Sequence, residues 1–357
     1  MRKHITLFLY LLSTLLFFGC DNDDDVEPTD EIETGATLTA AMGSDLVDQV
    51  YIDLSEGVMT SVAVNTWELA FENNGSAIKT NSAKKVAIAI PATTDFDEVT
   101  SDDDLVYSYD SSDGDLSATA LDGWETNQPY VIDLGVDENG NALGIKKFII
   151  TATTSTTVSI QYAELDGSDA QSVDVELDGG DFTFYSLINS QTVEVEPANW
   201  DLVLTAVSVR TGAPCAAMGS SAVPGVNCDI YRLSASAITN TYQGVQVAVD
   251  NPFSELEEDD DPEAEINQQS IDSSNFDELG ISDYNTIGAS SSADAIGRTW
   301  LQILEPHSSG VYKVYDFITY IVKDVDGNYY KLRFLAYKGG DNAENGYPTF
   351  EYELLTE

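Results

Sequence analysis

Asp-Gly and Asn-Gly pairs divide most of this 357-residue chain into short segments. Such pairs favour two-residue hairpin turns, whose central residues take positive φ angles. Many of the segments between them are rich in β-branched residues or alternate apolar and acidic residues, which is typical of strands with one wet face. No long stretch has helical periodicity, so we expect an all-β fold of antiparallel sheets and hairpins. The turn pairs begin at Asp122, Asn139, Asp166, Asp178, Asp326 and Asn345.

Two segments of the chain resemble each other. In residues 51–71, Tyr51 precedes Trp67 by 16 residues, and in residues 185–205, Tyr185 precedes Trp200 by 15. In each, a strand and a turn lead to a second strand that opens with Trp. The two segments are either a duplicated hairpin or a chance similarity between β sequences, and we favour duplication.

The N-terminus has the pattern of a lipoprotein signal peptide. Two basic residues precede an uncharged, Leu- and Phe-rich run that is too short to span a bilayer. Gly19-Cys20 then ends a segment that looks like a bacterial lipobox. We therefore expect residues 1–19 to be removed and Cys20 to carry the lipid, because two or three acyl chains give stable anchoring.

An acidic stretch follows Cys20. Residues 20–40 have a high charge and few apolar residues at their start, which predicts a disordered tether ahead of a folded region at 41–357. Acidic residues directly after a lipidated Cys are similar to the surface-export signal of Bacteroidetes lipoproteins. This similarity implies an outer-membrane location, on the cell surface.

The formal net charge is −47. Nucleic-acid binders are basic, so we exclude that class, and we expect contact with the membrane through the lipid alone. Acidic residues are densest at 255–265, and we interpret residues 254–294 as a surface loop. This loop is either a flexible insertion or carries a short ordered element around Phe276 and Ile281.

Two cysteines remain after Cys20. Cys215 and Cys228 lie 13 residues apart in a turn-rich segment, and in an oxidising compartment a disulfide between them is the default expectation. The sequence has no Gly-X-Ser-X-Gly, Walker A or HExxH motif, so we do not expect an enzyme.

Several motifs of the chain are informative together: Trp67-Glu68-Leu69-Ala70-Phe71, Ile78-Lys79-Thr80-Asn81-Ser82, Val195-Glu196-Pro197, Ala295 to Trp300, Tyr320 to Phe334 and Gly346 to Tyr352. They resemble motifs of the HmuY-like haem-binding lipoproteins of Bacteroidetes. The resemblance spans roughly residues 45–357, and its C-terminal part is the more specific. It implies an all-β protein that binds haem and passes it to an outer-membrane receptor.

The family holds haem iron between two His or two Met side chains. Of the two His in this chain, His4 leaves with the signal peptide and His307 has no His partner. Met218 is therefore our first candidate ligand, Met59 the second, and His307 a mixed partner. The alternative is a binding or structural lipoprotein of the same fold that recognises a glycan, a peptide or a receptor.

Lipid anchoring at Cys20 can be tested directly. The Cys20→Ala variant should lose the lipid and be released from membranes, because no other segment is apolar enough to retain it. Detergent-phase partitioning of wild type and variant measures this. Equal partitioning of the two proteins into detergent would contradict the prediction.

Overall fold

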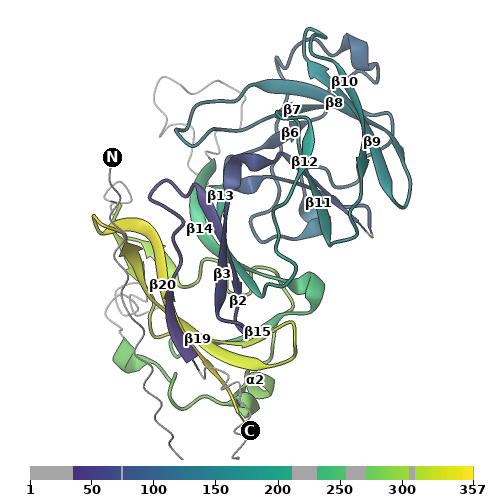
Figure 1. The fold of residues 1–357 in the computed structure, drawn as a ribbon. Helices are drawn as coiled ribbons and strands as arrows, with labels where there is room; N and C mark the ends of the chain where they lie inside the picture. The colour runs from purple at the N-terminus through teal and green to yellow at the C-terminus, as the bar shows by residue number, and fades with distance from the viewer. Residues whose placement is uncertain (1–34, 74, 211–230, 255–270, 305–309, 357) are drawn as a thin grey trace, which may run out of the picture. The chain divides into compact units, whose positions relative to one another are not determined.

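The computed structural model describes residues 35–73, 75–210, 231–254, 271–304 and 310–356. The predicted signal peptide, Cys20, Cys215, Cys228, Met218 and His307 lie outside these ranges. The described residues form antiparallel strands with short 3₁₀ turns and the helix α2 (Ile281–Ile287), so the all-β prediction is confirmed (Figure 1). The 3₁₀ turns are η1 (Val64–Thr66), η2 (Ser82–Lys84), η3 (Phe96–Glu98), η4 (Leu116–Ala118), η6 (Thr241–Gln243) and η7 (Ile271–Ser273).

Four sheets carry the fold, and we name them A to D. In order of pairing, sheet A contains β1 (Gly35–Thr39), β20 (Glu344–Leu354), β19 (Tyr329–Gly339), β18 (Thr319–Lys323) and β15 (Gln246–Asp250). Sheet B contains β14 (Tyr231–Thr239), β13 (Leu202–Arg210), β2 (Asp48–Asp53) and β3 (Val58–Ala63). Sheet C contains β12 (Gln191–Val193), β11 (Phe182–Ser186), β4 (Leu69–Glu72) and β5 (Ile78–Thr80). Sheet D contains β10 (Gln171–Glu176), β9 (Thr157–Glu164), β8 (Ile145–Thr153), β7 (Pro129–Asp133) and β6 (Ala87–Ala89). A separate pair joins β16 (Leu301–Ile303) to β17 (Tyr312–Val314).

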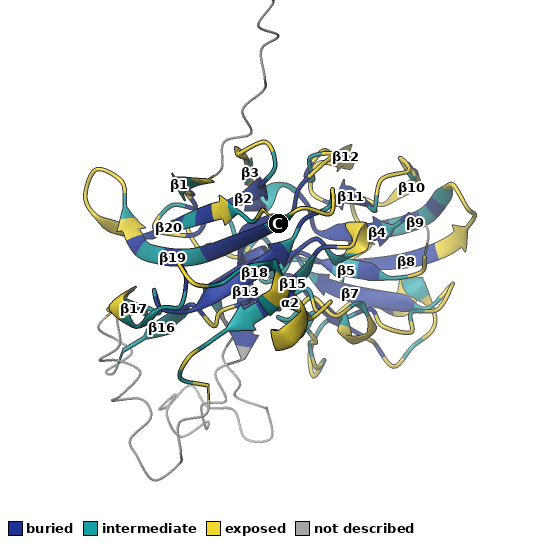
Figure 2. Cartoon of the chain, turned by 90° about the horizontal axis from the view of Figure 1, so that it is seen from below, coloured by how far each residue is buried: buried dark blue, intermediate teal, exposed yellow. Residues whose placement is uncertain are grey.

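The sheets pack face to face in the order A, B, C, D. One apolar cluster combines side chains of A and B, a second those of B and C, and a third those of C and D. Successive residues of a central strand therefore enter different clusters: Val50 and Ile52 face sheet A, whereas Tyr51 faces sheet C. Burial on both faces explains why these strands are nearly continuous apolar runs. Figure 2 shows the strands mainly in the colours of buried residues and the loops as exposed.

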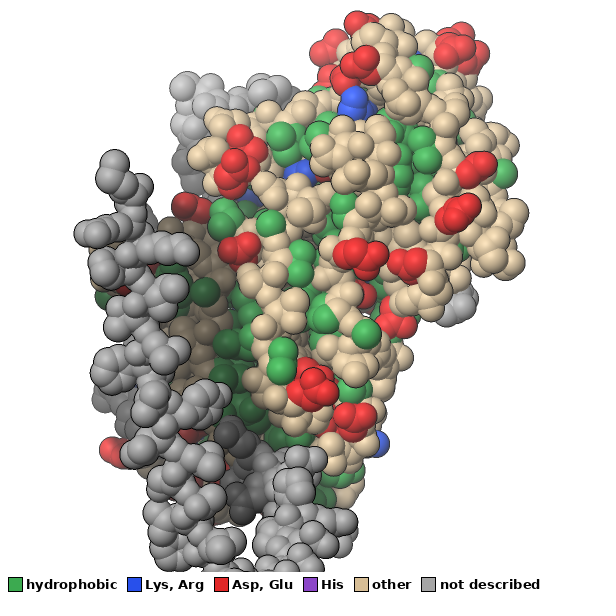
Figure 3. All heavy atoms as spheres, viewed as in Figure 1, with side chains coloured by type: hydrophobic (Ala, Val, Ile, Leu, Met, Phe, Trp, Pro, Cys, Tyr) green, Lys and Arg blue, Asp and Glu red, His purple; other side chains and the backbone are tan. Residues whose placement is uncertain are grey.

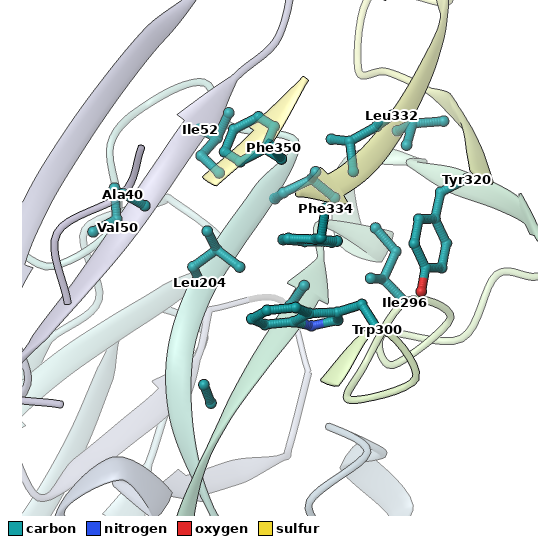
Figure 4. Close-up of a cluster of buried hydrophobic side chains, with 14 of the residues drawn as sticks. Ala40, Val50, Ile52, Leu204, Ile296, Trp300, Tyr320, Leu332, Phe334 and Phe350 are labelled. Atoms are coloured by element: carbon teal, nitrogen blue, oxygen red, sulfur yellow. The ribbon is translucent and has the colours of Figure 1, made fainter. Parts of the chain in front are cut away.

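The cluster between sheets A and B is the largest. The Trp300 indole stacks on Phe334 with ring centroids 4.1 Å apart, and Tyr320 meets Phe334 edge-on (Figure 4). The aromatic residues of the C-terminal hairpin thus fill the core. That hairpin turns at Asp324, as its Asp-Gly pair indicates, and the Asp324 N–H donates to the Asn328 carbonyl.

Two predicted boundaries differ from the structure. Strand β1 pairs with β20 from Gly35 onward, so the folded region begins inside the range assigned to the tether. Its alternating burial explains the pairing, because Ala36 and Leu38 pack on the core between A and B. In the predicted loop 254–294, the described residues 271–294 contain a short ordered element around Phe276 and Ile281. Phe276 is buried, and α2 begins at Ile281.

The two similar segments occupy equivalent places, but neither is a hairpin closed on itself. Strand β2 pairs with β13 of the other segment, and β11 pairs with β4, so the second strands are exchanged. Strand β3 stays in sheet B beside β2, and η1 then leads the chain to β4 in sheet C. Tyr51 of β2 lies opposite Val203 of β13, and Ala70 of β4 lies opposite Phe184 of β11. The same offset of 133 residues relates Tyr51 to Phe184 and Ala70 to Val203. Tyr51 therefore corresponds to Phe184, and our alignment with Tyr185 is wrong by one residue.

The acidic residue after each Trp, Glu68 or Asp201, accepts a hydrogen bond from the backbone of the other segment. The Leu187 N–H donates to Glu68 Oε2 at 2.7 Å, and the Leu54 N–H donates to Asp201 Oδ2 at 2.8 Å. Both carboxylates are fully buried. Each one therefore caps the end of a strand that belongs to the other segment.

The two carboxylates differ in their counter-charge. Glu68 forms an ion pair with Lys84, and both side chains are completely buried. No cation pairs with Asp201 among the described residues, and its second oxygen accepts from the Val325 N–H at 2.9 Å. Burial, with smaller contributions from Asp324 and Asp53, raises the pKa of Asp201 to about 6.

Removal of the buried cation should be costly. Lys84→Met leaves Glu68 charged and uncompensated, and we expect the free energy of unfolding to fall by roughly 3–5 kcal/mol. The double variant Glu68→Gln/Lys84→Met should recover much of this loss, because no charge remains buried. Urea denaturation measures both, with the exposed Lys338→Met as the matched control. A Lys84→Met protein as stable as the control would contradict this expectation.

Stability should increase on mild acidification. The pKa of Asp201 is higher in the native state than its ordinary value of 3.8, so the native state binds the proton more tightly between about pH 4 and pH 6. Stability therefore falls as pH rises through this window, by roughly 1 kcal/mol from pH 5 to pH 7.5 for this group alone. Burial raises the pKa values of Asp110, Asp133, Glu196 and Asp324 in the same direction. Urea denaturation at both pH values tests this, and Asp201→Asn should reduce the pH dependence; an unchanged dependence would refute the assignment.

Candidate functional site

The candidate site is a cavity of about 440 Å³ that we name the η2 cavity. It lies where η1, η2, the β7–β8 connection and the start of β14 meet. Its volume is within the range of small-molecule sites, which are mostly apolar with a few polar groups that orient the ligand. The apolar lining residues are Leu46, Val47, Val64, Ala83, Val136 and Leu233.

The local sequence fixes η2 beside this cavity. The Asn81 side-chain amide donates to the carbonyls of Val64 at 2.6 Å and Trp67 at 3.0 Å, which joins η1 to η2. Lys85 then takes a left-handed conformation with φ of 61° and ends the turn. As a result the two neighbouring lysines differ: Lys84 is buried against Glu68, whereas Lys85 is half-buried and lines the cavity.

The β7–β8 connection forms the opposite wall. The Val136 N–H donates to the Lys84 carbonyl at 2.9 Å, and Gly135 lies so close that a Cβ there would be 2.0 Å from the same oxygen. Asn65 Nδ2 donates to Glu138 Oε2 at 3.0 Å and links the wall to η1. Both walls are thus tied to η2, so the cavity is formed before any ligand binds.

The charges around the cavity are mixed. Lys84 and Lys85 are its cations, whereas Asp45, Asp137 and Glu138 supply carboxylates. Hydrogen bonds from Asn141 lower the pKa of Asp137 and keep it ionised. Lys85 forms no ion pair within the described part of the chain, so its ammonium can meet an acidic group of a ligand. Elsewhere acidic side chains are widely spread, as the face in Figure 3 shows.

None of the described lining residues is His, Met or Cys. Likewise, the described residues contain no cluster of three His, Cys, Asp or Glu that could hold a metal ion. The described lining of this cavity therefore supplies no His, Met or Cys ligand for haem iron.

Predicted site residues relate to the η2 cavity in different ways. Met59 is on β3, partly buried against the core between A and B, and it does not line the cavity. The segment 211–230, with Met218, Cys215 and Cys228, connects β13 to β14. Its ends are adjacent because Arg210 pairs with Tyr231, and Leu233 two residues later lines the cavity. His307 and Cys20 lie outside the described residues.

Our sequence reading missed the role of Asn81, Lys84 and Lys85. For Lys84 and Lys85 the signal is charge: the chain has 15 Lys and Arg against 62 Asp and Glu, so adjacent lysines are rare in it. The motif Ile78-Lys79-Thr80-Asn81-Ser82 contains one of these residues, but neither pattern reveals that Lys84 is buried. That outcome depends on Glu68, which is 16 residues away.

Within the described residues, we find no helix with the length and apolarity needed to cross a membrane. No curated protein matches the sequence significantly.

Solved structures similar to this chain share little sequence with it. One, from Bacteroides vulgatus, is described as HmuY-like and haem-binding; its identity is 13%, and the match covers 91% of this chain and 93% of that one, with a TM-score of 0.24. Apo PinO from Porphyromonas gingivitis is 9% identical, with coverages of 90% and 97% and a TM-score of 0.28. The apo HmuY analogue of Tannerella forsythia is 10% identical, with coverages of 92% and 100% and a TM-score of 0.19.

The family assignment rests on the sequence match. A family model described as HmuY protein matches residues 45–174 and 178–352, which together exceed half of the chain. The break between the two matches, residues 175–177, covers the end of β10 and the residue after it. This chain belongs to the HmuY family.

Proposed function

We propose that this protein is a lipid-anchored haem-binding protein of the bacterial surface that passes haem to an uptake receptor. The observation that carries the proposal is the HmuY family match across residues 45–174 and 178–352. The protein acts by binding, and haem is its cargo.

The η2 cavity has features that suit haem. Its apolar residues can cover part of the macrocycle, and Lys85 can pair with a propionate. This pairing matters because a chain with a net charge of −47 repels an anionic ligand elsewhere on its surface. The lysine therefore favours one orientation, with the propionates at η2.

Met218 is the preferred iron ligand. The segment that carries it connects two strands beside the cavity, and the eight residues that follow Arg210, ending at Met218, can span at most roughly 26–29 Å. A disulfide between Cys215 and Cys228 would restrict this segment further. Met59 ranks lower because it packs on the core, and His307 is retained as the mixed partner.

Export and anchoring complete the proposal. Cys20 would carry the lipid, the acidic residues after it would direct the chain to the cell surface, and the folded region would face the medium. Haem bound at the η2 cavity could then reach a receptor without release of the anchor.

Haem binding is tested by titration of haemin into the full chain, with and without dithionite. We expect a shifted Soret band that strengthens on reduction, because a thioether ligand favours ferrous iron. Met218→Ala should weaken binding at least about tenfold, and His307→Ala should have the smaller effect. Lys85→Glu should weaken binding more at low salt than at high salt.

Two controls separate the site from the fold. Met59→Ala, at the other Met candidate, should leave the Soret shift unchanged, and Lys338→Glu should not reproduce the effect of Lys85→Glu. If no Soret shift occurs in either redox state, the haem proposal is wrong and a binding lipoprotein of the same fold takes its place. If His307→Ala alone abolishes binding, haem stands but Met218 is not the ligand.

A further inference from the structure

A second cavity, separate from the η2 cavity, opens at the end of the core between sheets C and D. Its volume is about 340 Å³. The β4–β5 turn and the β8–β9 turn border it, and its floor consists of Phe71, Ile78 and Val158, which belong to that core. The core is thus open to solvent at this end, in a cavity large enough for a small molecule.

Trp124 forms an aromatic wall of this cavity. It is half-buried, whereas Trp67, Trp200 and Trp300 are at most 8% exposed. Trp124 Nε1 donates to the Ser76 carbonyl at 2.6 Å, and the Trp124 N–H donates to the Leu121 carbonyl at 3.1 Å. The first bond holds the indole ring and the second holds the Trp124 backbone, so the orientation of the ring is set in the free protein.

Hydroxyl groups line the rim. Thr153, the last residue of β8, and Ser155, in the β8–β9 turn, are exposed, and the Thr154 hydroxyl accepts from the Thr156 N–H at 3.2 Å. A turn with three adjacent hydroxyls offers donors and acceptors without adding charge.

Glu72 provides one carboxylate. Its Oε2 accepts from the Ala77 N–H at 2.9 Å, and its Oε1 accepts from the Tyr242 hydroxyl at 3.1 Å. A carboxylate has about four acceptor positions, so roughly two remain for a ligand. Because two donors already hold it, the carboxylate is a fixed acceptor for hydroxyl groups.

From this combination we propose that the cavity binds a neutral carbohydrate residue. The apolar C–H face of a sugar ring can stack on the electron-rich face of the Trp124 indole, while its hydroxyls bond to the rim and to Glu72. An anionic ligand would be repelled by Glu72 and by the net charge of −47. A neutral ring with many hydroxyls fits both the apolar and the polar walls.

The test uses the haem-free full chain and a panel of neutral mono- and disaccharides, measured by calorimetry and by tryptophan fluorescence. Because the other three Trp are buried, a saturable change in emission on sugar addition reports Trp124. At least one sugar of the panel should bind. Its affinity should fall at least about tenfold in Trp124→Ala, less in Trp124→Phe, and several-fold in Thr153→Ala/Ser155→Ala.

The matched control is Thr192→Ala, an exposed threonine on β12, which should bind as wild type does. Circular dichroism of each variant establishes whether it is folded. If Trp124→Ala does not fold, the variant Thr153→Ala/Ser155→Ala, which changes only exposed residues, still tests the proposal. Absence of binding by every sugar up to about 50 mM would overturn the proposal. So would binding that persists unchanged in both Trp124→Ala and the double variant. Neither outcome affects haem binding, which is read from the Soret band at another cavity.

Discussion

The exchange of strands between two similar segments is the constraint on which the structure depends. Strand β2 completes its ladder with β13, and β11 with β4, so neither segment has a full set of partners by itself. Glu68 and Asp201 secure the two crossings from equivalent positions. Glu68 also forms an ion pair with Lys84, the last residue of η2. The Lys84 carbonyl in turn accepts from Val136 in the wall of the η2 cavity. The site thus inherits its geometry from the same buried carboxylate that holds sheet C together.

Local patterns in the sequence predict the strands, turns and fold class, because these depend on neighbouring residues. The Asp-Gly pair at Asp326 marks the C-terminal hairpin, and the alternation in β10 marks a strand with one wet face. Pairing partners are harder to predict, since they depend on residues far apart in the chain. The similarity of the Trp67 and Trp200 segments is visible in the sequence, yet a hairpin within each and an exchange between them have the same local pattern.

The candidate site shows the same limit more sharply. The sequence identifies the Met residues that could bind iron, but not which of them lie near a cavity. Met59 packs against the core, whereas the segment with Met218 joins two strands beside the η2 cavity. Lys84 and Lys85 are neighbours of the same type, and the left-handed conformation at Lys85 separates their roles. Burial of the Lys84 ammonium is costly unless a counter-charge compensates for the lost water. Glu68 supplies this charge, and it reaches Lys84 only when sheet C forms.

The pairing of β1 with β20 bears on how the molecule is made. The first strand of the folded region aligns with the last one, Gly35 opposite Glu353, so a sheet edge closes only when nearly the whole chain is present. Contacts between such distant residues slow folding, because a very long loop must close before they form. A chain still being synthesised would therefore leave this sheet edge unpaired until its last strand is made. Completion of the sheet is in this way coupled to completion of the chain.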